Sequence, residues 1–210
     1  MSWTLENWDR LAEALGEHVV LVGMALAISL VIAFPLGIAA ARRPGLYVAT
    51  MSVTGVLYTI PALALFAFLI PVMGLGKKPA ITALVLYSLL ILVRNIAIGI
   101  REIPAELIEA ADGMGYGRGH RLVRIELPLA LPVIVAGIRI TAVTQIAVAT
   151  VAAYINAGGL GDIIFQGITQ DFGEKIVAGA VLTSLLAIVV DESLKVLERR
   201  LRAASAAEPL

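Results

Sequence analysis

Charged residues and glycines at regular spacing, the kinds of residue that could carry a function, are concentrated in one polar segment, 101–128, between two long apolar runs. Pro104 can open a short helix there. Three acidic residues then recur at every third position and share one face: Glu106, Glu109 and Asp112. Glycines occupy alternate positions across 113–119, where a straight helix would lose about 1 kcal/mol for each, and a basic amphipathic stretch follows until Pro128. The pattern predicts two exposed helices joined by a glycine elbow, which suits docking; ordinary surface helices of mixed charge are the alternative.

The other polar residues do not form a catalytic or metal-binding set. The chain has no cysteine, and its two histidines, His18 and His120, are far apart in sequence. No acidic cluster has metal-ligand spacing, and no Ser-His-Asp set is evident. The phosphate-binding pattern Gly-x4-Gly-Lys-[Ser/Thr] is missing, since Gly76-Lys77-Lys78 lacks the first glycine and the hydroxyl. We therefore expect no catalytic residue, no metal and no cofactor on this chain, and an enzyme is disfavoured.

Charged side chains inside the apolar runs are costly in a bilayer and so point to function. Four of them lie at similar depth towards one side of the membrane: Arg94, Arg139, Asp191 and Glu192. We hypothesise that Asp191 or Glu192 pairs with Arg94 or Arg139, which would tie the last apolar run to the third or fourth. The alternative is that each long side chain snorkels to the membrane surface.

A second polar set consists of aromatic, hydroxyl and amide side chains in or beside the second and fourth apolar runs: Tyr58, Thr59, Thr141, Thr144, Gln145 and Tyr154. Gly137 and Val148 share one helical face of small residues with the two later threonines, and Gln145 lies beside that face. These residues are candidates for lining a path through the membrane. Ordinary helix packing is the alternative, because Ser and Thr commonly bond to nearby carbonyl groups.

The segment between the fourth and fifth apolar runs contains a glycine-rich string at 157–161. Gly158, Gly159 and Gly161 give flexible backbone, and the following stretch, 162–168, is apolar enough to dip into the membrane interface. We interpret the three glycines as an outer gate or docking segment. A tight turn followed by a helix lying on the surface is the alternative.

The composition places all of these residues in a membrane protein. Hydrophobic residues make up 60% and charged residues 15% of 210 positions, and the mean hydropathy is +0.94. A bilayer core needs about 20 apolar residues per helix. Four stretches reach that length and the fifth does so only if it continues to about Leu197: 19–41, 46–70, 80–100, 129–155 and 176–190. We predict an all-α integral membrane protein with about five transmembrane helices.

The basic residues are divided unequally between the two sides of these spans. If segment 101–128 is cytoplasmic, ten arginines and lysines lie on that side and four on the other, as the positive-inside bias favours. The N-terminus is then outside and the C-terminus cytoplasmic. The expected organisation is an external segment 1–18, a transmembrane domain 19–197 and a tail 198–210, unstructured after Arg202. A net charge of zero gives no sign of a nucleic-acid partner.

The spacing within the polar segment resembles that of one known family. Its pattern, Glu-Ala-Ala-x3-Gly-x9-Ile-x-Leu-Pro, falls on Glu109, Ala110, Ala111, Gly115, Ile125, Leu127 and Pro128. Permease subunits of type I ABC importers carry a similar loop, and the resemblance implies their fold, that of methionine-importer-like permeases. It implies a coupling helix seated on a separate ATP-binding subunit, which would hold ATP and magnesium. It also implies a second permease copy or related permease chain and an external substrate-binding protein at the inner membrane.

Further segments look like those of osmoprotectant permeases: 59–65, 93–95, 126–134, 157–167 and 197–201. That family imports glycine betaine, proline betaine, carnitine or choline, so the resemblance implies a quaternary-ammonium compatible solute. Two departures are Ile96, where threonine is more usual, and Asn156, which replaces a common glycine. A methionine-type permease is the alternative among importers, and a passive channel is the alternative outside them.

Overall fold

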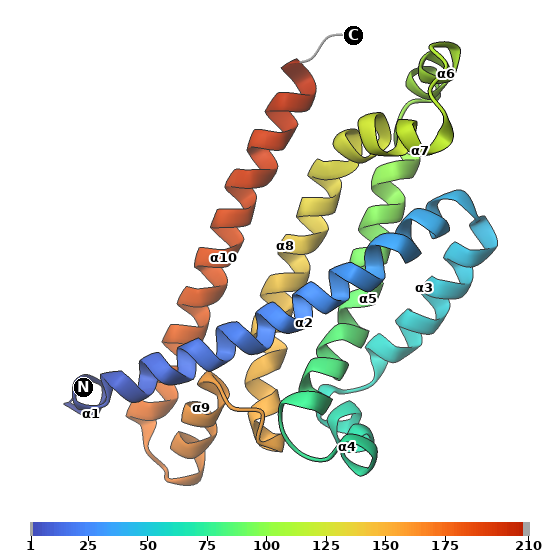
Figure 1. The fold of residues 1–210 in the computed structure, drawn as a ribbon. Coiled ribbons are helices and arrows are strands. Elements are labelled where there is room, and N and C mark those ends of the chain that lie inside the picture. The colour runs from blue at the N-terminus through green and yellow to red at the C-terminus, as the bar shows by residue number, and fades with distance from the viewer. Residues whose placement is uncertain (1, 208–210) are drawn as a thin grey trace.

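The computed structural model describes residues 2–207, with side chains for residues 3–203, and this part of the chain contains helices and no strand. The long helices are joined by short turns and by short helices (Figure 1). The α-helices are α1 Ser2–Glu6, α2 Trp8–Arg42, α3 Pro44–Thr59, α4 Ala62–Met73, α5 Lys77–Arg101, α6 Ala105–Gly113, α7 Arg118–Arg121, α8 Leu127–Ala152, α9 Leu160–Thr169 and α10 Gly173–Ala207. A π-helical turn, Leu122–Glu126, joins α7 to α8, and a 3-10 turn, Ala153–Ile155, follows α8. The predicted all-α class is confirmed.

Four stretches of helix are long and apolar enough to cross a membrane: α2, α5, α8 with its flanking turns, and α10. The helices α3 and α4 meet at an angle of 98° and count as a fifth crossing only as a broken pair. The apolar stretch 46–70 is therefore broken into two helices at the expected position, Pro61, and the break is sharper than a kink in one helix. Pro61 holds Ile60 in an extended conformation, with φ −68° and ψ 127°, so the helix ends there instead of bending slightly.

The chain runs back and forth between two ends of the molecule (Figure 1). One end, here called the loop end, carries α6, α7 and the last turns of α10; the opposite end carries α1, α4 and α9. The polar loop and the C-terminal part therefore share a side, while the N-terminal part lies on the other. The charge bias predicts this relation, and the side that faces the cytoplasm stays a prediction.

Two expected boundaries differ from the structure. No structural break lies at residue 18, because α2 is one helix of 35 residues that begins at Trp8, and the point where α2 enters the membrane stays a prediction. A helix of that length extends about 52 Å, more than a bilayer core of about 30 Å, and α2 runs obliquely across α5 and α8 (Figure 1). The tail expected to be unstructured after Arg202 is helical as far as Ala207, and its residues 208–210 lie outside the described part.

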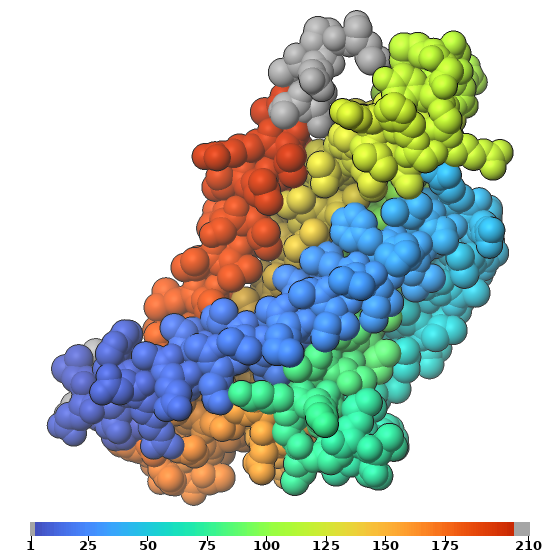
Figure 2. Space-filling view, viewed as in Figure 1, coloured from blue at the N-terminus to red at the C-terminus, as the bar shows by residue number. Residues whose placement is uncertain are grey.

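The helix α5 forms the centre of the packed core and contacts α2, α8, α3 and α4. Towards the opposite end, apolar residues of α2, α4, α5 and α8 pack around Phe66 and Leu84, and towards the loop end those of α2, α5 and α8 pack around Ile96. Close approach of the helices requires glycine, because a Cβ on Gly137 would lie 2.5 Å from the Cβ of Asn95. In the space-filling view α2 covers this core, and residues 105–126 stand out from the loop end (Figure 2).

Candidate functional site

The polar segment forms two short helices at the loop end, as the sequence predicts. In α6 the side chains divide into two faces: Glu109 and Ala110 are exposed, whereas Ala111 is fully buried. Further along, Ile125 and Leu127 are half-buried and Pro128 is exposed. The exposed face of α6 is therefore free to contact another molecule, and Ala111 lies on its buried face.

Gly115 ends α6 by adopting a left-handed conformation, with φ +83°. The N–H of Gly115 donates to the carbonyl of Asp112 (3.0 Å), and the N–H of Tyr116 donates to the carbonyl of Ala111 (3.1 Å). This pair of bonds is a Schellman motif, in which glycine is the favoured residue at the left-handed position. The ring of Tyr116 then packs edge-on against His120 in α7, at 4.9 Å. The elbow therefore has one defined geometry that depends on Gly115.

The second loop helix does not end at Pro128 as expected. It passes through the π-helical turn into α8, where the N–H of Leu127 donates to the carbonyl of Leu122. A proline inside a regular helix collides with the carbonyl four residues earlier. In the π turn the hydrogen bond spans five residues and not four, and this turn ends just before Pro128, which lies in the first turn of α8. The loop is therefore joined rigidly to a membrane span.

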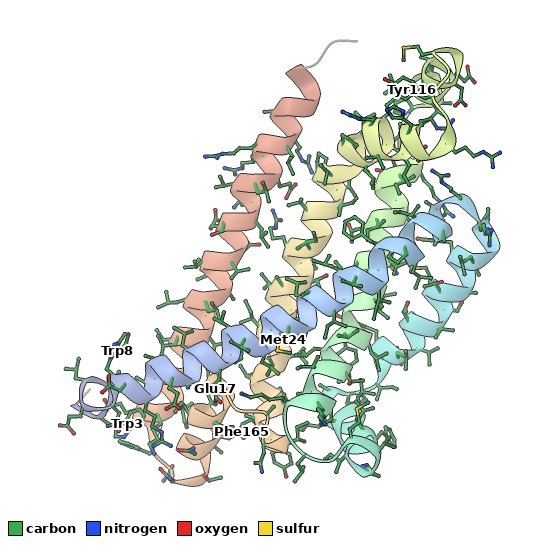
Figure 3. The ribbon with its side chains drawn as sticks, in the orientation of Figure 1. Trp3, Trp8, Glu17, Met24, Tyr116 and Phe165 are labelled. Carbon is green, nitrogen blue, oxygen red and sulfur yellow. The ribbon has the colours of Figure 1, made fainter. Side chains whose placement is uncertain are left out.

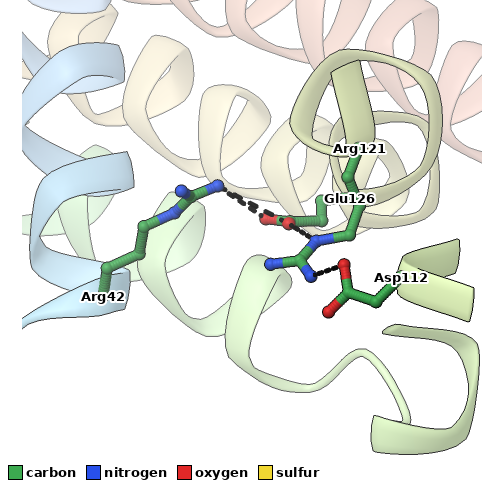
Figure 4. A network of polar contacts seen from close by, with 4 residues as sticks. All are labelled: Arg42, Asp112, Arg121 and Glu126. Carbon is green, nitrogen blue, oxygen red and sulfur yellow. Dashed lines mark hydrogen bonds and ion pairs between the residues drawn. The ribbon is translucent and has the colours of Figure 1, made fainter. Parts of the chain in front are cut away.

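A charge network that sequence reasoning missed joins four elements at the loop end (Figure 4). Glu126 in the π turn is 4% exposed, and its carboxylate accepts from Arg42 at the end of α2 (3.2 Å) and from Arg121 in α7 (2.9 Å). Arg121 also pairs with Asp112 of α6. The available signal was one acid among basic and apolar residues in the stretch 118–127. The network fixes the loop to the first span.

At the opposite end, the glycine string is closely packed. Gly158 and Gly159 have φ values of +83° and +86°, and the N–H of Gly159 donates to the Glu17 carboxylate of α2 (3.1 Å). Lys77, at the start of α5, pairs with the same carboxylate at 3.1 Å. A Cβ on Gly161 would lie 2.1 Å from the Thr150 carbonyl oxygen. Figure 3 shows Glu17 and Phe165 at this end, far from Tyr116 of the loop.

Two further residues near this turn have a clear physical explanation. Asn156, the departure noted in the sequence, adopts the left-handed region at φ +62°, which asparagine tolerates better than most residues. Burial raises the pKa of the Asp162 carboxyl in α9; the nearby Glu17 charge raises it further, and Arg10 opposes both. The left-handed Asn156 and the close packing of Gly161 make this turn a fixed junction between α8 and α9 in this conformation.

Of the four intramembrane charges, the structure brings two together. Arg139 contacts Asp191 (3.0 Å) and also Glu198 (2.9 Å), which ties α8 to α10. Glu192 does not take part, because it faces Lys195 on its own helix at 2.8 Å. Arg94 is exposed and forms no ion pair within the described part of the chain. Of the four pairings that the hypothesis allowed, the structure contains Arg139 with Asp191, and Glu198 is a partner that sequence reasoning missed.

The paired set leads to a stability prediction. Arg139→Gln removes the cation that Asp191 and Glu198 share between packed helices, and Glu198 then keeps only its pair with Arg202 on α10 among the described residues. We expect less folded protein and a lower melting temperature in detergent. The triple variant Arg139→Gln, Asp191→Asn, Glu198→Gln also removes the two acids that lost this cation and should recover most of that loss. Glu192→Gln is the matched control, since its partner is a nearby lysine at the surface. Failure of the triple variant to recover stability would contradict the pairing.

The polar candidates for a membrane path separate into two groups. Thr141, Thr144 and Gln145 line a shallow groove between α8 and α5, together with Tyr87 and Ser88. Tyr58 packs its ring edge-on against Tyr87, at 5.6 Å. Thr59 lies outside this groove lining, as does Tyr154, which is 70% exposed and packs on Phe165 near α9. Tyr87 and Ser88 were missed, although both are polar residues inside an apolar run.

Hydrogen bonds in this groove are only partly satisfied. The hydroxyls of Thr141 and Thr144 donate to the carbonyls of residues 137 and 140 on their own helix, as the packing alternative predicts. The amide nitrogen of Gln145 donates to the Ser88 hydroxyl (2.6 Å). Its amide oxygen is buried and has no partner within the described residues. A buried amide oxygen without a donor is costly, so the described residues leave the hydrogen bonding of Gln145 incomplete.

Comparisons with known proteins agree with one another. The family described as binding-protein-dependent transport system inner membrane component matches residues 33–203. The carnitine transport permease protein OpuCB of Listeria monocytogenes is 42% identical over 196 residues, which cover 93% of this chain and 90% of that protein. The choline transport system permease protein OpuBB of Bacillus subtilis is 41% identical over 185 residues, or 88% and 85% of the two chains. A solved inward-facing structure of the MetNI methionine ABC transporter superposes with a TM-score of 0.82 at 25% identity, covering 91% and 95%.

Proposed function

Because the chain belongs to the family of binding-protein-dependent transport system inner membrane components, we propose that it is the permease subunit of an ABC importer for quaternary-ammonium compatible solutes. The observation that carries the substrate class is the near-full-length similarity, at about 40% identity, to permeases named for carnitine, choline and osmoprotectants. The methionine transporter shares the fold at 25% identity. That difference in identity favours compatible solutes over methionine.

The loop at 101–128 is the coupling element of this proposal. Its helix α6 stands out from the membrane part with Glu109 and Ala110 exposed, and the later part of the loop is anchored to α2 where Glu126 joins Arg42 and Arg121. A rigid, protruding helix of this kind can transmit a movement of a docked subunit to the spans. We infer that the docked subunit is the ATP-binding chain, which would hold ATP and magnesium.

The other partners follow from the family and the surface. A permease of this class receives its solute from an external binding protein, whose aromatic rings hold quaternary ammonium by cation-π attraction. In our proposal the end with Gly158, Gly159 and Gly161 faces that protein, and the loop end faces the cytoplasm. Four or five crossings cannot enclose a regulated pore alone, so a second copy or a related permease chain would complete the pathway in the inner membrane.

Uptake measurements test the proposal directly. Cells that carry the complete transporter are compared with cells lacking this gene, at low and high osmolarity, with labelled glycine betaine, carnitine, choline and methionine. We expect uptake of one or more of the quaternary-ammonium solutes to fall to background in the deletion strain and return with the gene. A change in methionine uptake alone would overturn the substrate class, and unchanged uptake of all four would overturn the whole proposal.

A further inference from the structure

Arg94 is an exposed charge on α5, the most deeply packed helix of the molecule. It lies seven residues, about 10.5 Å along the helix, from Arg101, which ends α5 and donates to the carbonyls of Ala40 and Ala41. Arg94 is thus well inside the apolar span. A charge there is costly and is retained when it has a partner or a function.

No acid of the described chain is committed to Arg94. At similar depth, Asp191 and Glu198 face Arg139, and Glu192 faces Lys195. Nearer the loop, Glu126 is held by Arg42 and Arg121. A second copy of the chain would carry the same pairs, so it offers no uncommitted carboxylate at this depth. The guanidinium therefore suits an anionic group from outside these pairs.

The position of Arg94 relates it to the groove between α5 and α8. Tyr87 and Ile91 line this groove, and Arg94 follows them on the same helical face, at seven and three residues. Helical side chains lean towards the N-terminal end of their helix, so we expect the guanidinium to lean towards Ile91 and away from the loop end. That direction takes it along the groove, not to the nearer membrane surface.

The groove offers complementary chemistry along its length. Farther from the loop lie the rings of Tyr58 and Tyr87, which pack edge-on at 5.6 Å. Beside them is the amide oxygen of Gln145, buried and without a donor. Arg94 adds a positive charge nearer the loop end. Aromatic faces and oxygen atoms attract a cation, and a guanidinium binds a carboxylate.

We propose that Arg94 binds the carboxylate of a zwitterionic quaternary-ammonium solute as it passes along the α5–α8 groove, while the rings of Tyr58 and Tyr87 lie on the side of its ammonium group. The inference rests on the proposed function. The groove encloses only about 10 Å³, about the room for one water molecule. It therefore forms one wall of the path, and the solute lies over it. Arg94 then selects zwitterions over plain cations at this point.

The test uses the complete transporter in proteoliposomes, with its ATPase and binding protein, and labelled glycine betaine, carnitine and choline. Arg94→Gln is expected to lower the turnover of betaine and carnitine at least tenfold and to leave choline turnover within about twofold. Arg94→Lys, which keeps the charge, is expected to retain a substantial part of the betaine turnover. Complex yield and ATPase activity stimulated by loaded binding protein should match the wild type in both variants.

The other outcomes are distinguishable. Equal loss for all transported solutes, or a lower yield of the complex, would show that Arg94 pairs with another subunit and would overturn the inference. Wild-type turnover of betaine and carnitine in Arg94→Gln would also overturn it. If the wild type carries the zwitterionic solutes but not choline, the stimulated ATPase activity becomes the control. Loss of that activity together with transport in Arg94→Gln would count against the inference, because a residue that only binds the solute is not required for docking of the binding protein. If the wild type carries none of the three solutes, the proposed function itself fails.

Discussion

Replacing Gly115 with proline is expected to abolish ATP-driven uptake while the protein still inserts into the membrane. Proline cannot adopt the φ of +83° found there. It also removes the N–H that donates to the Asp112 carbonyl. Both bonds of the Schellman motif depend on this residue, so α6 would leave the elbow in a different direction. Uptake and co-purification of the ATP-binding subunit measure the effect, and we expect both to fall to background.

Other glycines of the elbow supply the controls for this experiment. Gly119 lies within α7 with no atom within 4 Å of a would-be Cβ, and Gly113 ends α6 in equally open space. Alanine at either position should leave uptake near the wild-type level. Alanine at Gly115 must adopt the left-handed region at a cost of about 1–2 kcal/mol and should give an intermediate loss. Normal uptake in Gly115→Pro would show that the loop is not the coupling element.

Local patterns in the sequence explain why much of the fold was predictable. Apolar runs near the length of a bilayer core mark the spans around 80–100 and 129–155, and the structure has helices there. The alternating glycines indicate the elbow, because a helix that ends in this way has a left-handed residue after its last turn, and glycine adopts that conformation most readily. Gly115 fulfils that need. Signals of this kind depend on neighbours in the chain, so a single sequence is enough to reveal them.

Features that depend on distant residues were less predictable. The effect of Pro61 on Ile60 is local, but the angle of 98° between α3 and α4 depends on how α4 packs against α5. Glu198 lies 59 residues from Arg139, its partner. Its sequence neighbours give no indication of which arginine it meets. The groove residues Tyr87 and Ser88 gain their setting only when α8 packs beside α5.

Replacing Glu126 with glutamine is expected to uncouple ATP hydrolysis from transport. The buried carboxylate bridges Arg42 and Arg121, and a neutral amide leaves two positive charges close together without an anion between them. The cost is about 1–3 kcal/mol, because the arginines are partly exposed and screened. A loss of that size in the coupled state corresponds to a roughly 5- to 150-fold fall in uptake. The ATPase should still bind and hydrolyse ATP, because the docking face of α6 is unchanged.

A comparison within the network separates coupling from general stability. Arg42→Gln breaks the link between Glu126 and α2, so it should resemble Glu126→Gln, and the double variant should lose little more than either single one. Asp112→Asn removes a more exposed acid that pairs only with Arg121 inside the loop, and it should lower uptake less than twofold. Uptake per ATP hydrolysed, measured in proteoliposomes, distinguishes these outcomes. If Asp112→Asn lowers this ratio as much as Glu126→Gln does, or if Arg42→Gln leaves it unchanged, movement of the loop does not reach the first span through Glu126.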